Sequence, residues 1–134
     1  GGLVYFAADD HAHGRELFVT DGTPAGTRLV ADIDPGSEGS SPHELSAPGD
    51  AAIVVFSAAD LAHGDEVWSS DGTVAGTRRL TDLRPGAEGS HPRGFTRVDD
   101  RLLFSADDGF HGREPYAMPL AALGMMLMQP PAKK

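Results

Sequence analysis

The 134-residue sequence contains no cysteine, which excludes disulfide bonds, thiolate metal sites and cysteine nucleophiles. Positive charge is also scarce, because 11 Lys and Arg stand against 20 Asp and Glu, for a formal net charge of −9. A chain this acidic is repelled by phosphate backbones and anionic lipid surfaces. We therefore expect no nucleic acid partner.

Long hydrophobic runs are absent as well. The longest apolar stretch, Met118 to Met128, is interrupted by Pro119 and Gly124. Its length is about half of what a membrane-spanning helix needs. The sequence therefore predicts no membrane span.

Recognisable catalytic sequences are missing too. The chain has no GxSxG, HExxH or P-loop sequence and no GxGxxG in a suitable context. Its many carboxylates are what a solvated acidic surface requires, so their abundance does not indicate acid–base chemistry. We expect the protein not to be an enzyme, and an acid–base hydrolase is the weakest of the hypotheses.

What the sequence does contain is a repeat of about fifty residues. ELFVTDGTPAGTRLVADIDPG, starting at Glu16, returns as EVWSSDGTVAGTRRLTDLRPG, starting at Glu66, with 11 of 21 positions identical. Other residues keep the same spacing of 50 and then 48 positions: Phe6, Phe56 and Phe104; Gly14, Gly64 and Gly112; Glu16, Glu66 and Glu114. The chain therefore divides into a repeat domain, 1–117, with copies at about 1–41, 42–91 and 92–117, and an apolar and basic tail at 118–134.

A complete copy is expected to form four short strands, and the two outer copies are incomplete. In the middle copy the strands are predicted at 43–47, 53–59, 66–70 and 77–83, between clusters of Gly, Pro or Asp. The connections are too short for a crossover helix, so successive strands should pair as an antiparallel meander. Two residues fewer in the third copy, where RVDD replaces APGDAA, indicate a hairpin turn at that point. Repeated four-stranded meanders predict an all-β fold of propeller-like blades.

Two segments resemble a known bacterial repeat. Glu16–Phe18 followed by Asp21–Thr23 resembles the ELWxxDGT repeat, and Glu66–Trp68 followed by Asp71–Thr73 does so again. The third copy departs from the pattern, because no DGT follows Glu114. The resemblance implies a propeller-like fold in an exported or cell-surface bacterial protein, and it implies no particular activity.

Strand counting predicts that one chain does not close a ring. The first copy lacks an opening strand and the third lacks a closing strand, which leaves about ten strands where a ring of four blades needs about sixteen. Uncovered blade faces and strand edges are unfavourable in water. We therefore expect a homo-oligomer or a place in a longer repeat array.

The repeated His-Gly-x-Glu sequence supplies most of the candidate binding residues, which are His13, Glu16, His63, Glu66, His111 and Glu114. A turn that brings His and Glu together could bind a transition metal, but two ligands are fewer than zinc normally takes. The favoured interpretation is a Gly-containing hairpin turn whose Glu bonds to neighbouring backbone N–H groups or to an Arg such as Arg28 or Arg78. The histidines outside this phase, His11, His43 and His91, are interpreted as surface residues.

The DGT segments have a local explanation. An Asp carboxylate accepts the backbone N–H two residues on, and Gly supplies a positive φ, so Asp21–Thr23 and Asp71–Thr73 predict turns. The alternative is calcium, with carboxylates from Asp9, Asp10, Asp60, Asp107 and Asp108. The DxDxDG spacing of a single calcium loop is missing. We therefore expect no cofactor and keep calcium as the alternative.

Phe18, Trp68 and Tyr116 hold one repeat position and therefore share a strand face. Aromatic side chains in phase could stack on sugar rings, which makes Trp68 a candidate glycan contact. Core packing is the commoner use of such residues, so Trp68 is expected to be buried. The function that the sequence favours is a non-catalytic structural or protein-interaction module, and the alternative is a propeller that binds calcium or carbohydrate.

Overall fold

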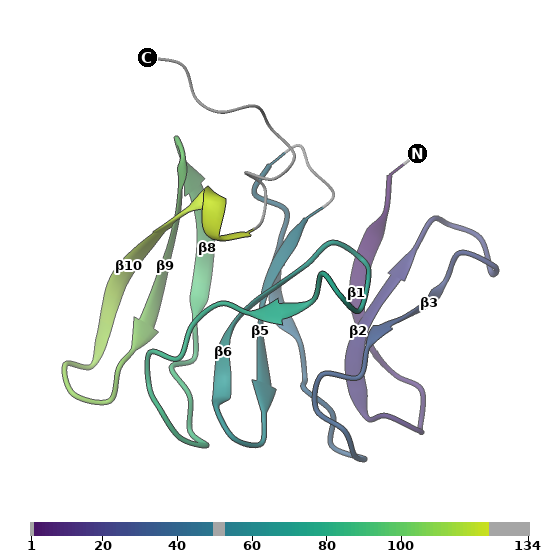
Figure 1. The fold of residues 1–134 in the computed structure, drawn as a ribbon, viewed down its shortest axis with the longest axis horizontal. Helices are drawn as coiled ribbons and strands as arrows, with labels where there is room; N and C mark the ends of the chain where they lie inside the picture. Colours follow the sequence, from purple (N-terminus) through teal and green to yellow (C-terminus); the bar gives the residue numbers. More distant parts are fainter. Residues whose placement is uncertain (1, 50–52, 124–134) are drawn as a thin grey trace.

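The computed structural model describes residues 2–49 and 53–123. Within them the chain forms three small antiparallel sheets and one short 3-10 helix, so the all-β class is confirmed (Figure 1). The first sheet contains β1 (Val4–Asp9), β2 (Arg15–Thr20) and β3 (Arg28–Ala31). The central sheet contains β4 (His43–Ser46), β5 (Val54–Asp60), β6 (Gly64–Ser70) and β7 (Arg78–Arg79). The third sheet contains β8 (Arg93–Val98), β9 (Arg101–Asp107) and β10 (Arg113–Pro119), and the helix η1 (Leu120–Leu123) follows.

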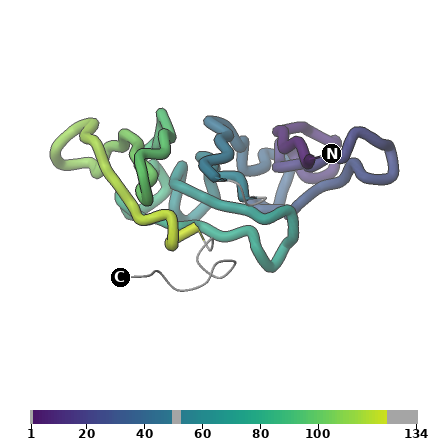
Figure 2. The backbone as a smooth tube through the Cα atoms, turned by 90° about the horizontal axis from the view of Figure 1, so that it is seen from above, coloured from purple at the N-terminus to yellow at the C-terminus, as the bar shows by residue number. Residues whose placement is uncertain are grey.

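Each sheet is a meander in which strands adjacent in the chain pair antiparallel, as expected. The hairpin predicted at RVDD is present, because β8 ends at Val98 and β9 begins at Arg101. Figure 2 shows the three sheets in a row in the order of the chain. The structure describes no closed ring or barrel within these residues.

The strand predicted at 77–83 is the least accurate of the four, because β7 covers only Arg78–Arg79. The Leu80 amide still donates to the Val67 carbonyl oxygen at 2.7 Å. The Val67 amide, however, donates to the Thr81 side-chain hydroxyl at 3.1 Å. A side chain thus replaces the backbone acceptor of the ladder, and the chain leaves the sheet there.

All three sheets have the same cross-strand register. Phe6 lies opposite Phe18, Phe56 opposite Trp68, and Phe104 opposite Tyr116. We call the side of each sheet that carries these aromatic pairs its phenylalanine face and the other side its reverse face. Because side chains alternate along a strand, neighbouring residues belong to opposite faces.

The core lies between the sheets and is formed in the same way twice. One cluster joins the phenylalanine face of the central sheet, including Val54 and Phe56, to Leu17 and Val19 on the reverse face of the first sheet. The other cluster joins the phenylalanine face of the third sheet to the reverse face of the central sheet, which supplies Val55 and Val67. Each sheet therefore packs on the back of the one before it.

The predicted boundary of the tail at 118 falls inside β10. Leu120 and Leu123 of η1 are buried and join the cluster between the central and third sheets. Residues 124–134 lie outside the described residues. No helix of the described part of the chain has the length and apolar character to cross a membrane.

Candidate functional site

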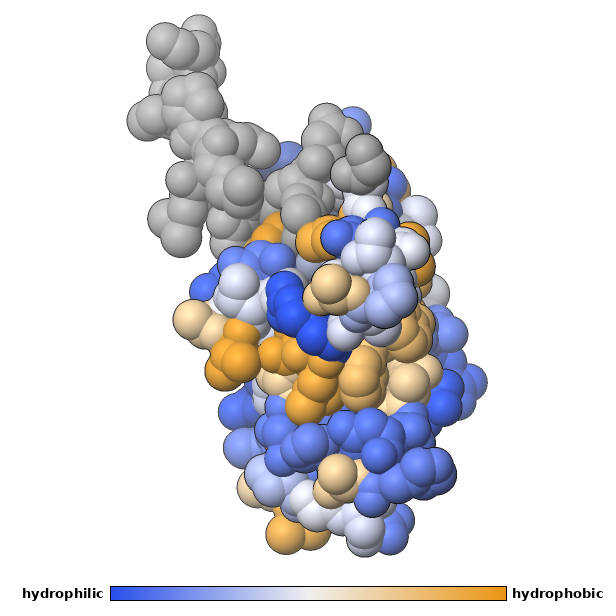
Figure 3. Space-filling model, turned by 90° about the vertical axis from the view of Figure 1, so that its right-hand side faces the viewer, coloured by the Kyte–Doolittle hydropathy of each residue, from blue (hydrophilic) through white to orange (hydrophobic). Residues whose placement is uncertain are grey.

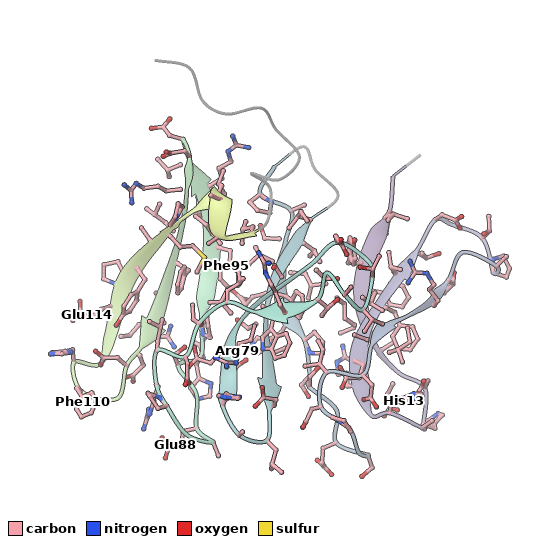
Figure 4. All side chains as sticks on the ribbon, in the orientation of Figure 1. His13, Arg79, Glu88, Phe95, Phe110 and Glu114 are labelled. Atoms are coloured by element: carbon pink, nitrogen blue, oxygen red, sulfur yellow. The ribbon has the colours of Figure 1, made fainter. Side chains whose placement is uncertain are left out.

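The three His-Gly-x-Glu segments lie at the β1–β2, β5–β6 and β9–β10 turns, along the lower edge of Figures 1 and 4. In each turn the histidine Nδ1 bonds to an Asp three residues earlier and not to the Glu. The three pairs are Asp10 with His13 at 2.7 Å, Asp60 with His63 at 2.8 Å, and Asp108 with His111 at 2.7 Å. The turns therefore do not form the His–Glu pair that metal binding at this position requires.

The same aspartates also cap the turn backbone. The Oδ1 atom of Asp10 accepts the amides of Ala12 and His13, at 2.9 and 2.8 Å. Asp60 and Asp108 accept the two corresponding amides of their own turns. An Asp carboxylate that accepts the amides of its own loop in this way stabilises a turn.

In the first and third turns, these bonds shift the pKa of the paired groups. The hydrogen bond from His13 is the main reason why the pKa of Asp10 falls from 3.8 to about 2. The same bond raises the pKa of His13. In the third turn, the bond between Asp108 and His111 lowers the pKa of the acid and raises that of the base. The first and third pairs therefore favour the ionised carboxylate beside a protonated imidazole.

Glu66 is completely buried and holds the loop that follows β7. Its Oε1 accepts the Arg84 amide at 3.1 Å, and its Oε2 accepts the hydroxyls of Thr81 at 2.7 Å and Ser90 at 2.8 Å. We call this arrangement the glutamate clamp. The favoured interpretation expected neighbouring backbone N–H groups, but Glu66 accepts one backbone amide, 18 residues away, and two side-chain hydroxyls.

Glu16 forms the same clamp in the first sheet. It accepts the amides of Asp34 at 2.9 Å and Ser40 at 3.2 Å, and the Ser40 hydroxyl. Burial raises the pKa of Glu16, and the bond from Ser40 opposes that rise. The alternative partner, an Arg, is wrong for the middle copy, because Arg78 donates to the Ala122 carbonyl oxygen at 2.9 Å.

The clamp also connects neighbouring sheets. The Ser40 carbonyl oxygen accepts the Ala59 amide of β5 at 2.9 Å. In the same way, the Ser90 carbonyl oxygen accepts the Asp107 amide of β9 at 2.8 Å. One serine thus bonds through its hydroxyl to a glutamate of one sheet and through its carbonyl to the next sheet.

Glu114 occupies the same position in the third sheet but lies in a different environment. It is exposed and projects from the outer strand β10 (Figure 4). No loop packs on Gly112 as the clamped loop packs on Gly64, since a Cβ at Gly112 would meet no atom within 4 Å. Within the described residues the third copy therefore shows no clamp.

Gly64 shows why the repeated His-Gly-x-Glu sequence contains glycine. It has a φ of 63°, and a Cβ there would collide with the Gly89 amide and the Ala87 carbonyl of the clamped loop. Asp65 forms a parallel bridge with Gly89 at this contact. The turn and the loop approach so closely that only two glycine backbones fit.

The DGT turns form as predicted. The Asp21 Oδ1 accepts the Thr23 amide at 2.9 Å, and the Asp71 Oδ1 accepts the Thr73 amide at 2.9 Å. Gly22 and Gly72 both have a φ of 93°. Bonds from the threonines also lower the pKa of both aspartates. These carboxylates therefore stabilise their own turns.

The other acidic candidates do not converge. Asp9 accepts the His11 amide at 2.7 Å, and Asp107 accepts the Gly109 amide at 2.8 Å. Among the described residues, no group of three or more Asp, Glu, His or Cys side chains is placed to hold a metal ion. The residues proposed for calcium therefore lie in separate turns of three sheets.

The phased aromatic residues share a face in each sheet but differ in burial. Trp68 is 9% exposed and belongs to the cluster between the first and central sheets, so its expected core position is confirmed. Phe18 and Tyr116 are half-buried. Each of these two stacks on its cross-strand phenylalanine, with ring centroids 5.8 and 5.9 Å apart.

Sequence reasoning missed one polar cluster, around Asp65. The Asp65 Oδ2 lies 3.2 Å from the His43 Nε2 and 3.3 Å from the His91 Nδ1. Both histidines are largely exposed, as predicted for surface residues, but they reach this nearly buried carboxylate from two directions. The bond to Asp65 raises the pKa of His43. The only signal in the sequence is that Asp65 stands where the other two copies have Arg15 and Arg113.

Comparison with protein-family models, curated proteins and solved structures found no match to this chain. The resemblance to the ELWxxDGT repeat therefore stays a prediction from the residues that carry it.

Proposed function

We propose that the protein is a non-catalytic structural or protein-interaction module whose sheets are propeller-like blades of an ELWxxDGT-type repeat. The observation that carries this proposal is the glutamate clamp. Glu66 belongs to the repeated His-Gly-x-Glu sequence, and it is buried and bonded to three donors of a loop that joins two sheets. The repeated polar residues thus maintain the scaffold.

The way the sheets stack supports the same proposal. Two interfaces join a phenylalanine face to a reverse face, and the three sheets share one register. Such nearest-neighbour packing is typical of repeat proteins, in which each unit stabilises the next and the outer surfaces bind partners. The resemblance to exported bacterial repeats adds the proposal of an extracellular or cell-surface location.

Thermal unfolding with and without ligands tests this role against the calcium and carbohydrate alternative. We expect the same Tm in a chelator, in millimolar calcium and with a panel of glycans. A ligand at one hundred times its Kd stabilises a folded protein by about 2.7 kcal/mol. Each kcal/mol moves the Tm of a small domain by several degrees, so a binding ligand would be readily visible.

A clear rise of the Tm with calcium or with one glycan would refute the non-binding structural role. The variants Asp10→Asn and Asp21→Asn would then locate a calcium response, because Asp10 lies in a His turn and Asp21 in a DGT turn. Loss of the response in one variant alone would assign the ion to that turn.

A further inference from the structure

One phenylalanine face is uncovered among the described residues. On the first sheet, Val4 is 61% exposed, and Phe6 and Phe18 are half-buried. None of the three belongs to either hydrophobic cluster. Figure 3 views this side of the molecule and shows an apolar band between hydrophilic margins. The corresponding residue in the central sheet, Phe56, has no exposed surface.

The chain itself shows what covers such a face. In the central sheet, Val54 and Phe56 pack on the reverse face of the first sheet. In the third sheet, Leu102 and Phe104 pack on the reverse face of the central sheet. Both covered phenylalanine faces therefore meet a reverse face, and neither meets another phenylalanine face.

One reverse face is uncovered as well, on the third sheet. Leu103 is 37% exposed, and Pro115 and Ala117 are exposed. Leu103 and Pro115 hold the repeat positions of Val55 and Val67, which form the covered reverse face of the central sheet. These three residues belong to neither hydrophobic cluster. The described chain thus has one free face of each kind, at its two ends.

We propose that the phenylalanine face of the first sheet binds the reverse face of the third sheet of a second copy of this chain. The inference rests on the proposed structural function and names its partner. The contact is heterologous, so each copy offers one surface of each kind, and copies join head to tail until a ring closes. Since each copy carries a formal charge of −9, salt strengthens the contact by screening.

Complementation between two variants tests this contact. Val4→Asp damages only the phenylalanine face, and Leu103→Asp damages only the reverse face. Light scattering at near-physiological salt should give the wild type a mass that is a multiple of 14.0 kDa. Each variant alone should have the mass of one chain. An equal mixture should recover pairs, because it still contains one intact surface of each kind.

Phe110→Asp is the matched control. Phe110 is 87% exposed in the β9–β10 turn, away from both faces (Figure 4), so its replacement should leave the assembly unchanged. Far-ultraviolet circular dichroism confirms that each variant is folded. If either Asp variant unfolds, Val4→Thr and Leu103→Thr replace it, and the affinities of these variants are compared instead.

Three results would overturn the proposal. A monomeric wild type would exclude the contact, and a mixture that stays monomeric would exclude complementary faces. If Leu103→Asp assembles like the wild type while Val4→Asp does not, the phenylalanine face binds a second phenylalanine face or another partner. A Tm response to calcium or a glycan would refute the structural function without altering any of these masses, so the two failures are distinguishable.

Discussion

The glutamate clamp allows the loss of stability on replacing Glu66 to be predicted. Glu66→Ala removes the acceptor of three hydrogen bonds, from Thr81, Arg84 and Ser90. Ser90 is fully buried, so its hydroxyl bears the full cost of an unsatisfied donor, about 1–3 kcal/mol. Thr81 and Arg84 lie in a partly exposed loop where water replaces part of the loss, at about 0.5–1 kcal/mol each. We expect Glu66→Ala to lower the free energy of unfolding by about 3 kcal/mol.

Two further variants show whether the clamp is the cause. Glu66→Gln keeps one acceptor oxygen, and the hydroxyls of Thr81 and Ser90 can rotate to suit it, so the cost falls to about 1 kcal/mol. Glu114→Ala is the matched control, because Glu114 holds the same repeat position but is exposed. Its free energy of unfolding should change by less than about 0.5 kcal/mol.

Urea unfolding followed by Trp68 fluorescence measures all three variants, since Trp68 is the single tryptophan and lies in the core. Equal effects of Glu66→Ala and Glu114→Ala would show that the clamp does not stabilise the protein. So would a Glu66→Ala protein that is as stable as the wild type, because three lost bonds to a buried carboxylate cannot be neutral.

Three other predictions use the same structure. Gly64→Ala should cost about 3 kcal/mol or more in urea unfolding because its Cβ meets the clamped loop, whereas Gly112→Ala should cost only the positive-φ strain of about 1–2 kcal/mol. Asp65→Asn should destabilise the protein more near pH 5.5 than near pH 8.5. The Asp65–His43 pair stabilises fully below 6.5, the ordinary pKa of His43, and this stabilisation is lost as pH rises through the raised pKa. The effect is below about 1 kcal/mol because His43 is largely exposed. Acrylamide should quench Trp68 weakly, and strong quenching would contradict its burial.

Much of the fold follows from features that are local in the sequence. The continuous apolar run that ends at Phe56 indicates a strand buried on both faces, and short connections force the meander. The Asp71–Thr73 turn depends on bonds between residues two to four positions apart. The end of β7 was missed because the Thr81 hydroxyl replaces a backbone acceptor, which no propensity records.

The Asp–His pairs and the glutamate clamp were only partly predictable from the sequence, each for a different physical reason. The Asp60–His63 pair is local and repeats in phase, so the sequence carried a signal that could have been used. The sequence carried part of the signal for the clamp, because Glu66 and Ser90 lie 24 residues apart and Glu16 and Ser40 have the same spacing.

The Asp65 cluster was not predictable. His43 lies on β4 of the same sheet and His91 in the loop before β8, so they meet Asp65 only after that sheet and that loop have formed. Asp65 also breaks the repeat pattern, so periodicity assigns it no partner. Contacts of this kind depend on tertiary geometry that neither spacing nor composition encodes.

The central and third sheets each pack their phenylalanine face on the reverse face of the preceding sheet. Nuclear Overhauser contacts from the ring of Phe56 test this stacking most directly. We expect contacts to the methyl groups of Leu17 and Val19. Contacts from Phe56 to the methyl groups of Leu102, which would bring two phenylalanine faces together, would contradict it.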